Sequence, residues 1–444
     1  MSNGVTALTR RTLVASGAAG GVALLAACDP LGREASPRPI AGPKEITWSC
    51  YQLGELREKA WNETWRLAEP ATGVKITVQW EPGAGYWDKR QVEFSAGTPG
   101  PDIIVNQVNW FIPGGINGMF VDHYEYMRRD KIDPKQYFQA VMESFAWKGK
   151  LWSLPFQFGG DMLYFNKGIL DAKGVKHPSK NSTMDELLDA ARRLTDAANN
   201  KFGIDIQQNT LPLVMGTFIL NFGGKLLNDA ADRVLYGDDV NAIRGAEFNV
   251  DLHVRHRVTP NAEARATLPA GKQPIEVQMV AMQIVGSHRI VQTRDAIGAN
   301  NLDFAPIPKG PAGIQTQGVG GNAWSLMSQS KAKDAAWAAL KWTHTKEGML
   351  GPQIPGLSWP PLIWAANSPQ WMDQFKGTHM ADVQKVWETA GRTQVVTPEG
   401  DKTWTTMSAP LSQALRGELA TRDAMQQSAR ETNALFAERP AAWR

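Results

Sequence analysis

The sequence predicts an α/β protein built from two unlike regions, and two observations lead to this prediction. First, strand-like and helix-like segments alternate between residues 44 and 107, which is the pattern of a parallel sheet with right-handed helical crossovers. Second, tryptophan is unevenly distributed: eight of the 17 lie between Trp48 and Trp152, none between residues 153 and 323, and nine from Trp324 onward. We interpret the middle of the chain, which lacks tryptophan, as a lobe of its own.

The N-terminal residues 1–27 are predicted to be an export signal. Arg10 and Arg11 precede an apolar run that is shorter than the roughly 20 residues of a membrane-spanning helix. The paired arginines resemble a twin-arginine signal, and the Leu-Ala-Ala-Cys sequence ending at Cys28 resembles a bacterial lipobox, where the new N-terminal cysteine carries lipid. The alternative is an ordinary anchor helix with an incidental cysteine. Residues 28–43 contain four prolines and no apolar period, which predicts a tether.

Charge and cysteine content limit the function classes further. Removal of residues 1–27 takes away two arginines and no acidic residue, so the formal net charge falls from +3 to +1. A near-neutral chain without basic blocks lacks the electrostatic footprint of a nucleic-acid-binding protein. With Cys28 assigned to lipid, Cys50 has no disulfide partner, and we expect it to be a small buried residue near a strand end.

The periodicity of apolar residues predicts the individual elements. Three strands are expected in the first region, at 44–51, 73–80 and 101–107. Helices are predicted over 54–69, 86–98, 182–198 and 330–348, and Thr183 and Glu186 fit a capping box at the start of the third. The tail from about 405 to 438 is rich in Ala, Gln, Glu and Arg, so we expect it to be helical.

The order of these elements also indicates where a ligand would bind. In open parallel sheets, ligands bind beyond the carboxyl ends of the strands. The first predicted strand ends at Tyr51 and Gln52, and the third is followed by residues 106–110, so we expect a ligand near both segments.

The sequence contains none of the motifs that we sought for catalysis or cofactor binding. His253 and His256 are the closest histidine pair, but no cysteine accompanies them, so we interpret them as solvated surface residues. There is no His-Glu-x-x-His, no Gly-x-Ser-x-Gly, and no P-loop or dinucleotide glycine spacing. Scattered acidic residues leave a glycosidase carboxylate pair open, because a sequence does not give their separation. We therefore predict no cofactor, no metal and no catalytic residue.

Three segments resemble the extracellular solute-binding proteins of ABC importers. In 149–175, a Leu-Pro pair, a glycine-containing turn and Leu-Tyr-Phe-Asn-Lys follow the family pattern, and 278–290 resembles the family's strand-to-helix turn at Gly-Ser. The longest match is 303–348, with Pro-Ile-Pro-Lys-Gly-Pro, then Gly-Gly-Asn-Ala-Trp and an Ala/Trp helix. Two departures concern the ligand: His288 stands where many sugar-binding members have tryptophan, and the loop 354–362 lacks the usual basic residue after its proline.

The resemblance implies a two-lobed, periplasmic-binding-protein-like α/β fold of the maltose-binding-protein type (type II), with a hinge between the lobes. The chain is expected to cross between lobes near 155–160 and 317–323, and a third time after the loop around Trp359. The implied lobes are listed by residue: 44–157 plus 319–365 form lobe 1, and 158–318 plus 366–444 form lobe 2.

The same resemblance places the ligand between the lobes. Sugars bind to flat aromatic faces and to amides, carboxylates and hydroxyls. The expected stacking residues are Trp110, Phe158, Trp324 and Trp359. The expected polar contacts are Tyr51, Gln52, Asn109, Gln157, Asp161, Ser287, His288 and Asn322. Each residue also has a structural alternative: a tryptophan can belong to the core, and Asp161 can cap the segment that follows it.

These expectations define a function. The resemblance implies a lipid-anchored, monomeric binding protein on the outer face of the cytoplasmic membrane, which captures a mono- or oligosaccharide and delivers it to an ABC permease. The alternatives are a secreted lipoprotein glycoside hydrolase, a binding protein for a non-sugar solute such as a polyol phosphate, and a binding protein that serves a sensor.

Overall fold

The computed structural model describes residues 40–351 and 359–443. Several predicted features lie outside the described residues: the export signal, Cys28, most of the tether, and residues 354–358 of the loop 354–362. Among the helices of the described ranges, none combines the length and apolar character that crossing a membrane requires.

The first half of the central sheet has the predicted alternation of strands and helices. Strand β1 (Glu45–Tyr51) pairs in parallel with β2 (Lys75–Glu81) and with β3 (Ile103–Gln107). The intervening helices are α1 (Glu55–Thr72) and α2 (Tyr86–Ser95). Helix α1 ends where Gly73 adopts a left-handed conformation, and α2 ends earlier than predicted, two residues before Gly97, which has a φ of 66°.

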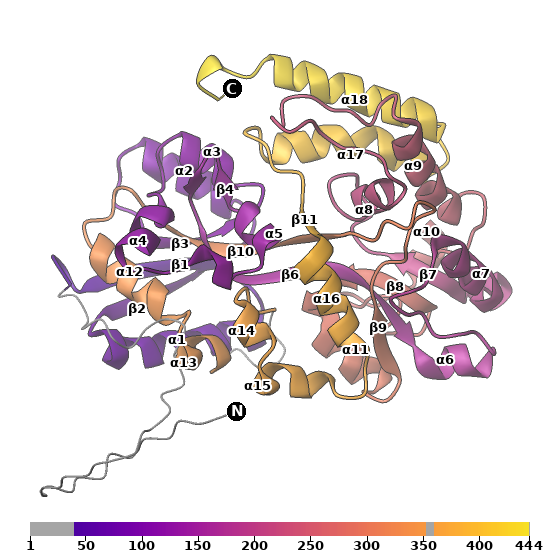
Figure 1. Cartoon of the computed structure of the whole chain (residues 1–444), viewed down its shortest axis with the longest axis horizontal. Coiled ribbons are helices and arrows are strands. Elements are labelled where there is room, and N and C mark those ends of the chain that lie inside the picture. Colours follow the sequence, from indigo (N-terminus) through magenta and orange to yellow (C-terminus); the bar gives the residue numbers. More distant parts are fainter. Residues whose placement is uncertain (1–39, 352–358, 444) are drawn as a thin grey trace, which may run out of the picture. The chain divides into compact units, whose positions relative to one another are not determined.

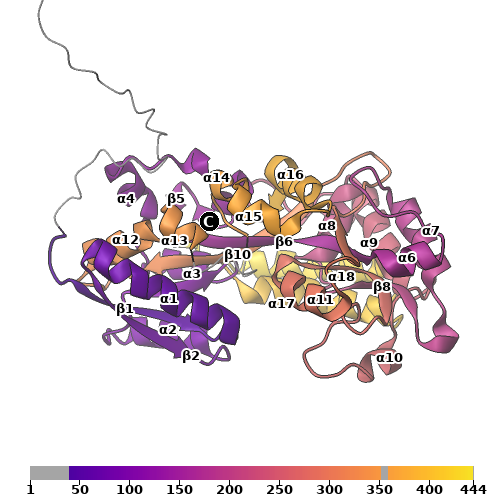
Figure 2. The same ribbon diagram turned by 90° about the horizontal axis from the view of Figure 1, so that it is seen from below.

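Two long strands join this half of the sheet to the second half (Figures 1 and 2). The first part of β6 (Leu154–Asn166) pairs with β10 (Gln317–Leu326), which also pairs with β3. The second part of β6 pairs with β8 (Val280–Gly286) and β9 (Leu302–Ala305), and β8 pairs in parallel with β7 (Phe202–Ile206). Strand β11 (Gly391–Thr393) pairs with the start of β10, which completes a nine-stranded sheet.

The remaining elements cover the sheet and its ends. A small hairpin consists of β4 (Ala146–Trp147) and β5 (Lys150–Leu151). The other helices along the chain are α3 (Phe111–Ile116), α4 (His123–Arg129), α5 (Gln139–Glu143), α6 (Lys167–Ala172), α7 (Met184–Leu194), α8 (Val214–Asn221), α9 (Val240–His253), α10 (Ala262–Ala266), α11 (Ile290–Ile297), α12 (Lys333–Trp342), α13 (Lys346–Leu350), α14 (Ile363–Ala366), α15 (Pro369–Met372), α16 (Met380–Ala390), α17 (Asp401–Leu415) and α18 (Thr421–Ala437). Short 3-10 turns are η1 (Pro134–Gln136), η2 (Ala197–Asn199), η3 (Ser287–Arg289), η4 (Asp373–Phe375) and η5 (Ala441–Trp443).

Helix boundaries confirm the predicted capping box and the helical tail, and they correct one predicted helix. The capping box at Thr183 and Glu186 is present at the start of α7. The single helix predicted over 330–348 is instead two helices, α12 and α13, because Thr345 caps a new start. The tail expected to be helical over about 405–438 consists of two helices, α17 and α18, and Gly417 adopts a φ of 75° between them.

Tryptophan packing explains why the first half of the sheet is rich in this residue. Trp48 of β1 lies against Trp61 and Trp65 of α1, with ring centroids 6.2 and 5.3 Å away. Two further aliphatic and aromatic clusters form around β7–β9 and between α8, α9, α17 and α18. Cys50 is free and buried, as predicted.

Candidate functional site

A row of three side-chain amides crosses the sheet where β3, β10 and β6 lie side by side. Asn322 of β10 is in register with Gln107 of β3 on one side and with Gln157 of β6 on the other. Residues directly opposite one another on paired strands project from the same face of a sheet. Gln107 donates a 2.6 Å hydrogen bond from Nε2 to the hydroxyl of Tyr51, at the end of β1. The row therefore presents several hydrogen-bonding groups on one face.

Two paired glycines come next along the same strands, and polar side chains from elsewhere lie over them. Gly159 of β6 is opposite Gly320 of β10. A Cβ atom on Gly159 would overlap the hydroxyl of Ser287, and one on Gly320 would lie 2.8 Å from the amide of Gln394. Glycine is needed at both positions because any larger residue would push these polar groups away from the sheet.

Asp161 lies two residues after Gly159 on β6. It projects from the same face as Gln157 and Gly159, because side chains alternate along a strand. Its register partner is Gly286 of β8, and the ring of His288 lies 2.6 Å from where a Cβ on that glycine would be. The structure gives Asp161 no hydrogen-bond or ion-pair partner among the described residues, and it is partly exposed. Burial raises the pKa of this carboxyl group to about 7. Asp161 lies inside β6 and caps no helix, so the capping alternative is wrong.

Two arginines lie beside His288. Arg289 donates from Nε and Nη2 to the buried carboxylate of Glu276, at 3.1 and 2.5 Å. Arg57 of α1 donates from Nη2 to the backbone carbonyl of His288, at 3.5 Å. Desolvation and then the charges of Arg57 and Arg289 lower the pKa of His288 to about 4, so this imidazole is neutral at pH 7.

Asn109 and Trp110 are held by a residue from the far end of the chain. The side-chain amide of Asn109 donates to one carboxylate oxygen of Asp401, at the start of α17, and the indole N–H of Trp110 donates to the other at 3.0 Å. The Trp110 ring stacks on Trp87, with planes 3° apart, and its edge meets Tyr51. The ring is fixed in orientation and remains partly exposed.

Three expected stacking residues are core residues instead. Trp324 is fully buried between Phe156, which stacks on it at 3.6 Å, and the tryptophans of β1 and α1. Phe158 is buried against Phe138 and Trp387. Trp359 is buried against Phe375, Trp371 and Trp387. Our prediction that they stack on a ligand is replaced by a packing role, since each ring is already surrounded by other rings.

The other predicted residues fall into two groups: those that lie together in the candidate site and those that lie outside it. Six of them lie together at β1, β10, β6 and the turn η3 after β8: Tyr51, Gln157, Asp161, Ser287, His288 and Asn322. Gln52 is exposed, and its backbone N–H donates to Glu81 on the β2 side of β1, away from β3. The interpretation of His253 as a solvated residue is wrong, because it is partly buried and hydrogen-bonded to Thr259 and Asn209.

Three further residues of the candidate site were not predicted from the sequence: Arg57, Arg289 and Gln394. Gln107, the last residue of β3, lies within 106–110, one of the two segments near which the strand-end rule placed the ligand. Arg57 and Gln394 carry no comparable signal, because they reach the site only through the packing of α1 and of the segment after β11.

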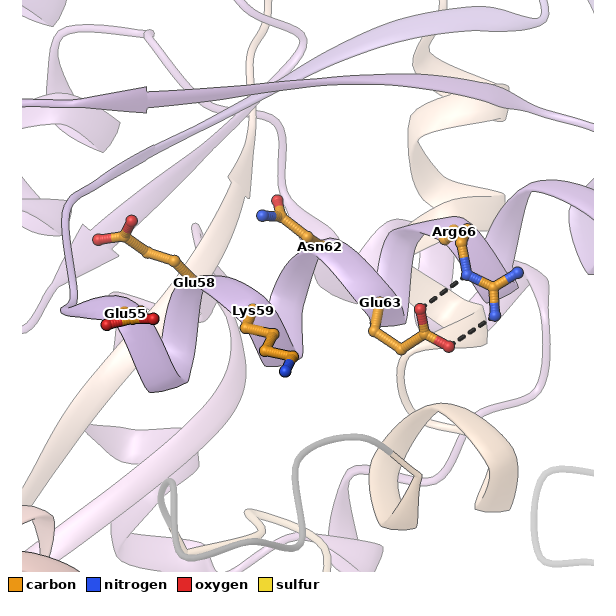
Figure 3. Close-up of a pocket in the computed structure, with 6 residues that line it drawn as sticks. All are labelled: Glu55, Glu58, Lys59, Asn62, Glu63 and Arg66. Atoms are coloured by element: carbon orange, nitrogen blue, oxygen red, sulfur yellow. Dashed lines mark hydrogen bonds and ion pairs between the residues drawn. The ribbon is translucent and has the colours of Figure 1, made fainter.

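A separate hollow of about 590 Å³ lies along the outer face of α1 (Figure 3). Its described lining side chains all come from this one helix: Glu55, Glu58, Lys59, Asn62, Glu63 and Arg66. Glu63 and Arg66 pair with each other at 2.6 and 2.7 Å, as the dashed lines in Figure 3 show. Charged side chains of one helix face, partly satisfied among themselves, are typical of a solvated surface, so our candidate for the functional site is the amide row of Gln107, Asn322 and Gln157 and not this hollow.

Comparisons with known proteins agree with this architecture. The erythritol/L-threitol-binding protein of Mycolicibacterium smegmatis is 22% identical over 383 residues, covering 77% of this chain and 78% of that protein. Among solved structures, the ABC substrate-binding protein Lmo0181 of Listeria monocytogenes, in complex with cycloalternan, superposes with a TM-score of 0.76 at 19% identity, over 89% of this chain and 99% of that chain. A solute-binding protein of Agrobacterium radiobacter K84, in complex with ribitol, superposes with a TM-score of 0.71 at 19% identity, over 90% and 100%.

These structures confirm the predicted fold class. The family model of bacterial extracellular solute-binding proteins matches residues 55–349, which span α1 to α13 and include both strands that join the halves of the sheet. The chain therefore belongs to the family of bacterial extracellular solute-binding proteins.

Proposed function

We propose that this protein captures a small polyhydroxyl solute, a sugar or a polyol, and delivers it to an ABC permease. The observation that carries the proposal is the unpaired carboxylate of Asp161 on the same sheet face as the amides of Gln157 and Asn322. A carboxylate accepts hydrogen bonds from two hydroxyls, and an amide both donates and accepts, so the group matches a chain of hydroxyls. The named ligands of the relatives, erythritol and L-threitol, ribitol and cycloalternan, belong to this chemical class.

We also propose that the two lobes close over the solute, and the same geometry supports this. Strands β6 and β10 carry site residues and also connect the two halves of the sheet. A solute that touches Asn322 on one side and His288 on the other favours the closed arrangement by its contacts with both. The lobe limits that we propose, 44–157 plus 319–365 and 158–318 plus 366–444, are supported by the change of pairing partners along β6 near Gly160.

The arrangement of the carboxylates near the site supports solute binding over glycoside hydrolysis as the function. Glycoside hydrolysis uses two carboxyl groups about 5 to 9 Å apart, one acid and one nucleophile or base. Asp161 is unpaired, whereas two other carboxylates near the site are engaged: Glu276 is buried in its ion pair with Arg289, and Asp401 accepts hydrogen bonds from Asn109 and Trp110. We therefore infer no second carboxylate poised for catalysis among the described residues of the site.

We further propose that export and lipid attachment at Cys28 keep the monomeric protein near its permease. This part rests on the sequence of residues 9–28. Replacing Cys28 by alanine should move the protein from the membrane fraction to the soluble fraction, and a wild-type protein that is already soluble would contradict lipid anchoring.

The test of the proposed function is a thermal unfolding screen of the purified protein. Neutral monosaccharides, oligosaccharides and polyols are each added in excess, and a ligand at 100 times its dissociation constant stabilises the folded protein by about 2.7 kcal/mol. We expect one class of polyhydroxyl compound to raise the unfolding temperature and to be recovered unchanged. Turnover of an aryl glycoside would favour the hydrolase, and the absence of a shift with every compound would contradict the proposal.

A further inference from the structure

We propose that Arg57 forms a position for an anionic group, a carboxylate or a phosphate, carried by the polyhydroxyl solute. This inference rests on the proposed function and narrows it, since it selects acidic sugars and polyols over their neutral counterparts.

The position of Arg57 places its charge within the site. It belongs to the first turns of α1, and its guanidinium reaches the backbone carbonyl of His288 in η3. Its charge acts on Tyr51 on one side and on His288 on the other, so it lies between the residue at the end of β1 and the turn that follows β8. Both neighbours are neutral at pH 7, because the pKa of Tyr51 is raised to about 12 and that of His288 is lowered to about 4.

The other nearby cation is already neutralised, and Arg57 is not. Arg289 pairs with Glu276 through two nitrogen atoms. Arg57 forms no ion pair with any acidic residue in the described part of the chain, and its one hydrogen bond, to a backbone carbonyl, is long. Asp161 does not serve as its counter-ion, because the two side chains form no ion pair or hydrogen bond with each other in the structure.

An unpaired guanidinium in this setting is costly unless a ligand compensates it. Arg57 is only partly exposed, and desolvation is the largest cause that lowers its pKa. A charge withdrawn from water normally has a partner of opposite charge. Guanidinium has a planar fork of N–H donors that matches carboxylate and phosphate oxygens, and such charge-assisted hydrogen bonds are stronger than neutral ones.

The site then has two chemically different ends. The Asp161 carboxylate and the amides of Gln157 and Asn322 accept and donate to hydroxyl groups, whereas Arg57 takes the anionic group. Asp161 would repel an anion at its own end once it is ionised, so the ligand would bind in one orientation.

The experiment compares neutral polyols with their acidic counterparts by calorimetric titration of the purified protein. The neutral arm uses glycerol, erythritol, L-threitol and ribitol. The carboxylate arm uses erythronate, threonate and ribonate, and the phosphate arm uses glycerol 3-phosphate and erythritol 4-phosphate. We expect at least one anion to bind about tenfold or more tightly than its neutral parent, with affinity that falls as salt increases. The two acidic arms distinguish a carboxylate from a phosphate.

Variants attribute the effect to the residue. Arg57→Gln should remove the preference for the anion, so that the variant binds the anion no more tightly than its neutral parent. Arg66→Gln is the matched control, because Arg66 lies on the same helix and pairs with Glu63 away from the site. Neutral polyols that bind as tightly as the anions, or an anion preference that persists in Arg57→Gln, would overturn the inference and leave the proposed function intact. If no polyhydroxyl compound of either charge binds, the proposed function itself fails.

Discussion

Replacing Trp324 by alanine separates a packing role from a ligand-stacking role. The side chain is fully buried, lies 3.6 Å from the ring of Phe156 at an interplanar angle of 9°, and meets Trp48 and Trp61 edge-on at 5.0 and 4.9 Å. Removing a buried tryptophan side chain costs about 3 to 5 kcal/mol through lost burial and the cavity that remains. We expect Trp324→Ala to lower the free energy of unfolding by about 4 kcal/mol.

The expected loss can be converted into a change in melting temperature. Unfolding entropy is about 2.1 cal/mol/K per residue, so the described chain, unfolding as one unit, would lose about 5 °C. Calorimetry and urea unfolding followed by circular dichroism are the suitable assays, because the substitution changes tryptophan fluorescence directly. Trp342→Ala is the control, since Trp342 is partly exposed on α12 and should cost less.

Ligand affinity provides the opposing result. Because the ring lies in the core, the folded variant should bind the solute within a few-fold of the wild type. A tenfold loss of affinity with a stability change below about 1 kcal/mol would refute the packing assignment and restore the stacking role.

Three further predictions concern the site itself. Asp161 has a folded-state pKa of about 7, above the ordinary value of about 3.9, so the folded protein binds more protons than the unfolded chain between these values. The free energy of unfolding should therefore fall as pH rises from about 4 to about 7, and ligand affinity should increase over the upper part of this range as the carboxylate ionises. Asp161→Asn should remove both trends, which unfolding and ligand titrations at several pH values would reveal. Gly159→Ala should displace the Ser287 hydroxyl and weaken ligand binding. The control is Gly83→Ala, where the nearest atom to the new Cβ is 3.9 Å away, and equal affinity of the two variants would contradict the close approach of Ser287 to Gly159. Asp401→Ala should release the indole of Trp110 and cost about 1 to 3 kcal/mol of stability, and an unchanged urea midpoint would contradict that estimate.

The sequence was informative wherever structure follows a local pattern of residues. The parallel β1–β2–β3 unit, the capping box at Thr183 and the buried Cys50 were all predicted from periodicity and residue type. The resemblance to solute-binding proteins located Gln157 and Asp161 on β6, Asn322 on β10, and His288 in the turn η3 that follows β8.

The remaining parts of the site depend on tertiary packing. Neighbouring polar residues made Trp324 resemble a site residue, yet its strand position points into the cluster formed by α1. Arg57 and Gln394 reach the site from segments that are distant from the matching motifs in the sequence. Asp401 contacts Trp110 across 291 positions of sequence, a pairing that no local pattern encodes.

The most direct test of the proposed site is calorimetric titration of the wild-type protein and Asp161→Asn with the polyhydroxyl compound that gives the largest thermal shift. Asp189→Asn is the matched control, because that carboxylate is exposed on α7. We predict one binding site per chain, an affinity reduced about tenfold or more in Asp161→Asn, and no change in Asp189→Asn. Equal affinity of wild type and Asp161→Asn at pH 8, where the carboxylate is ionised, would contradict our assignment of the solute to this face of the sheet.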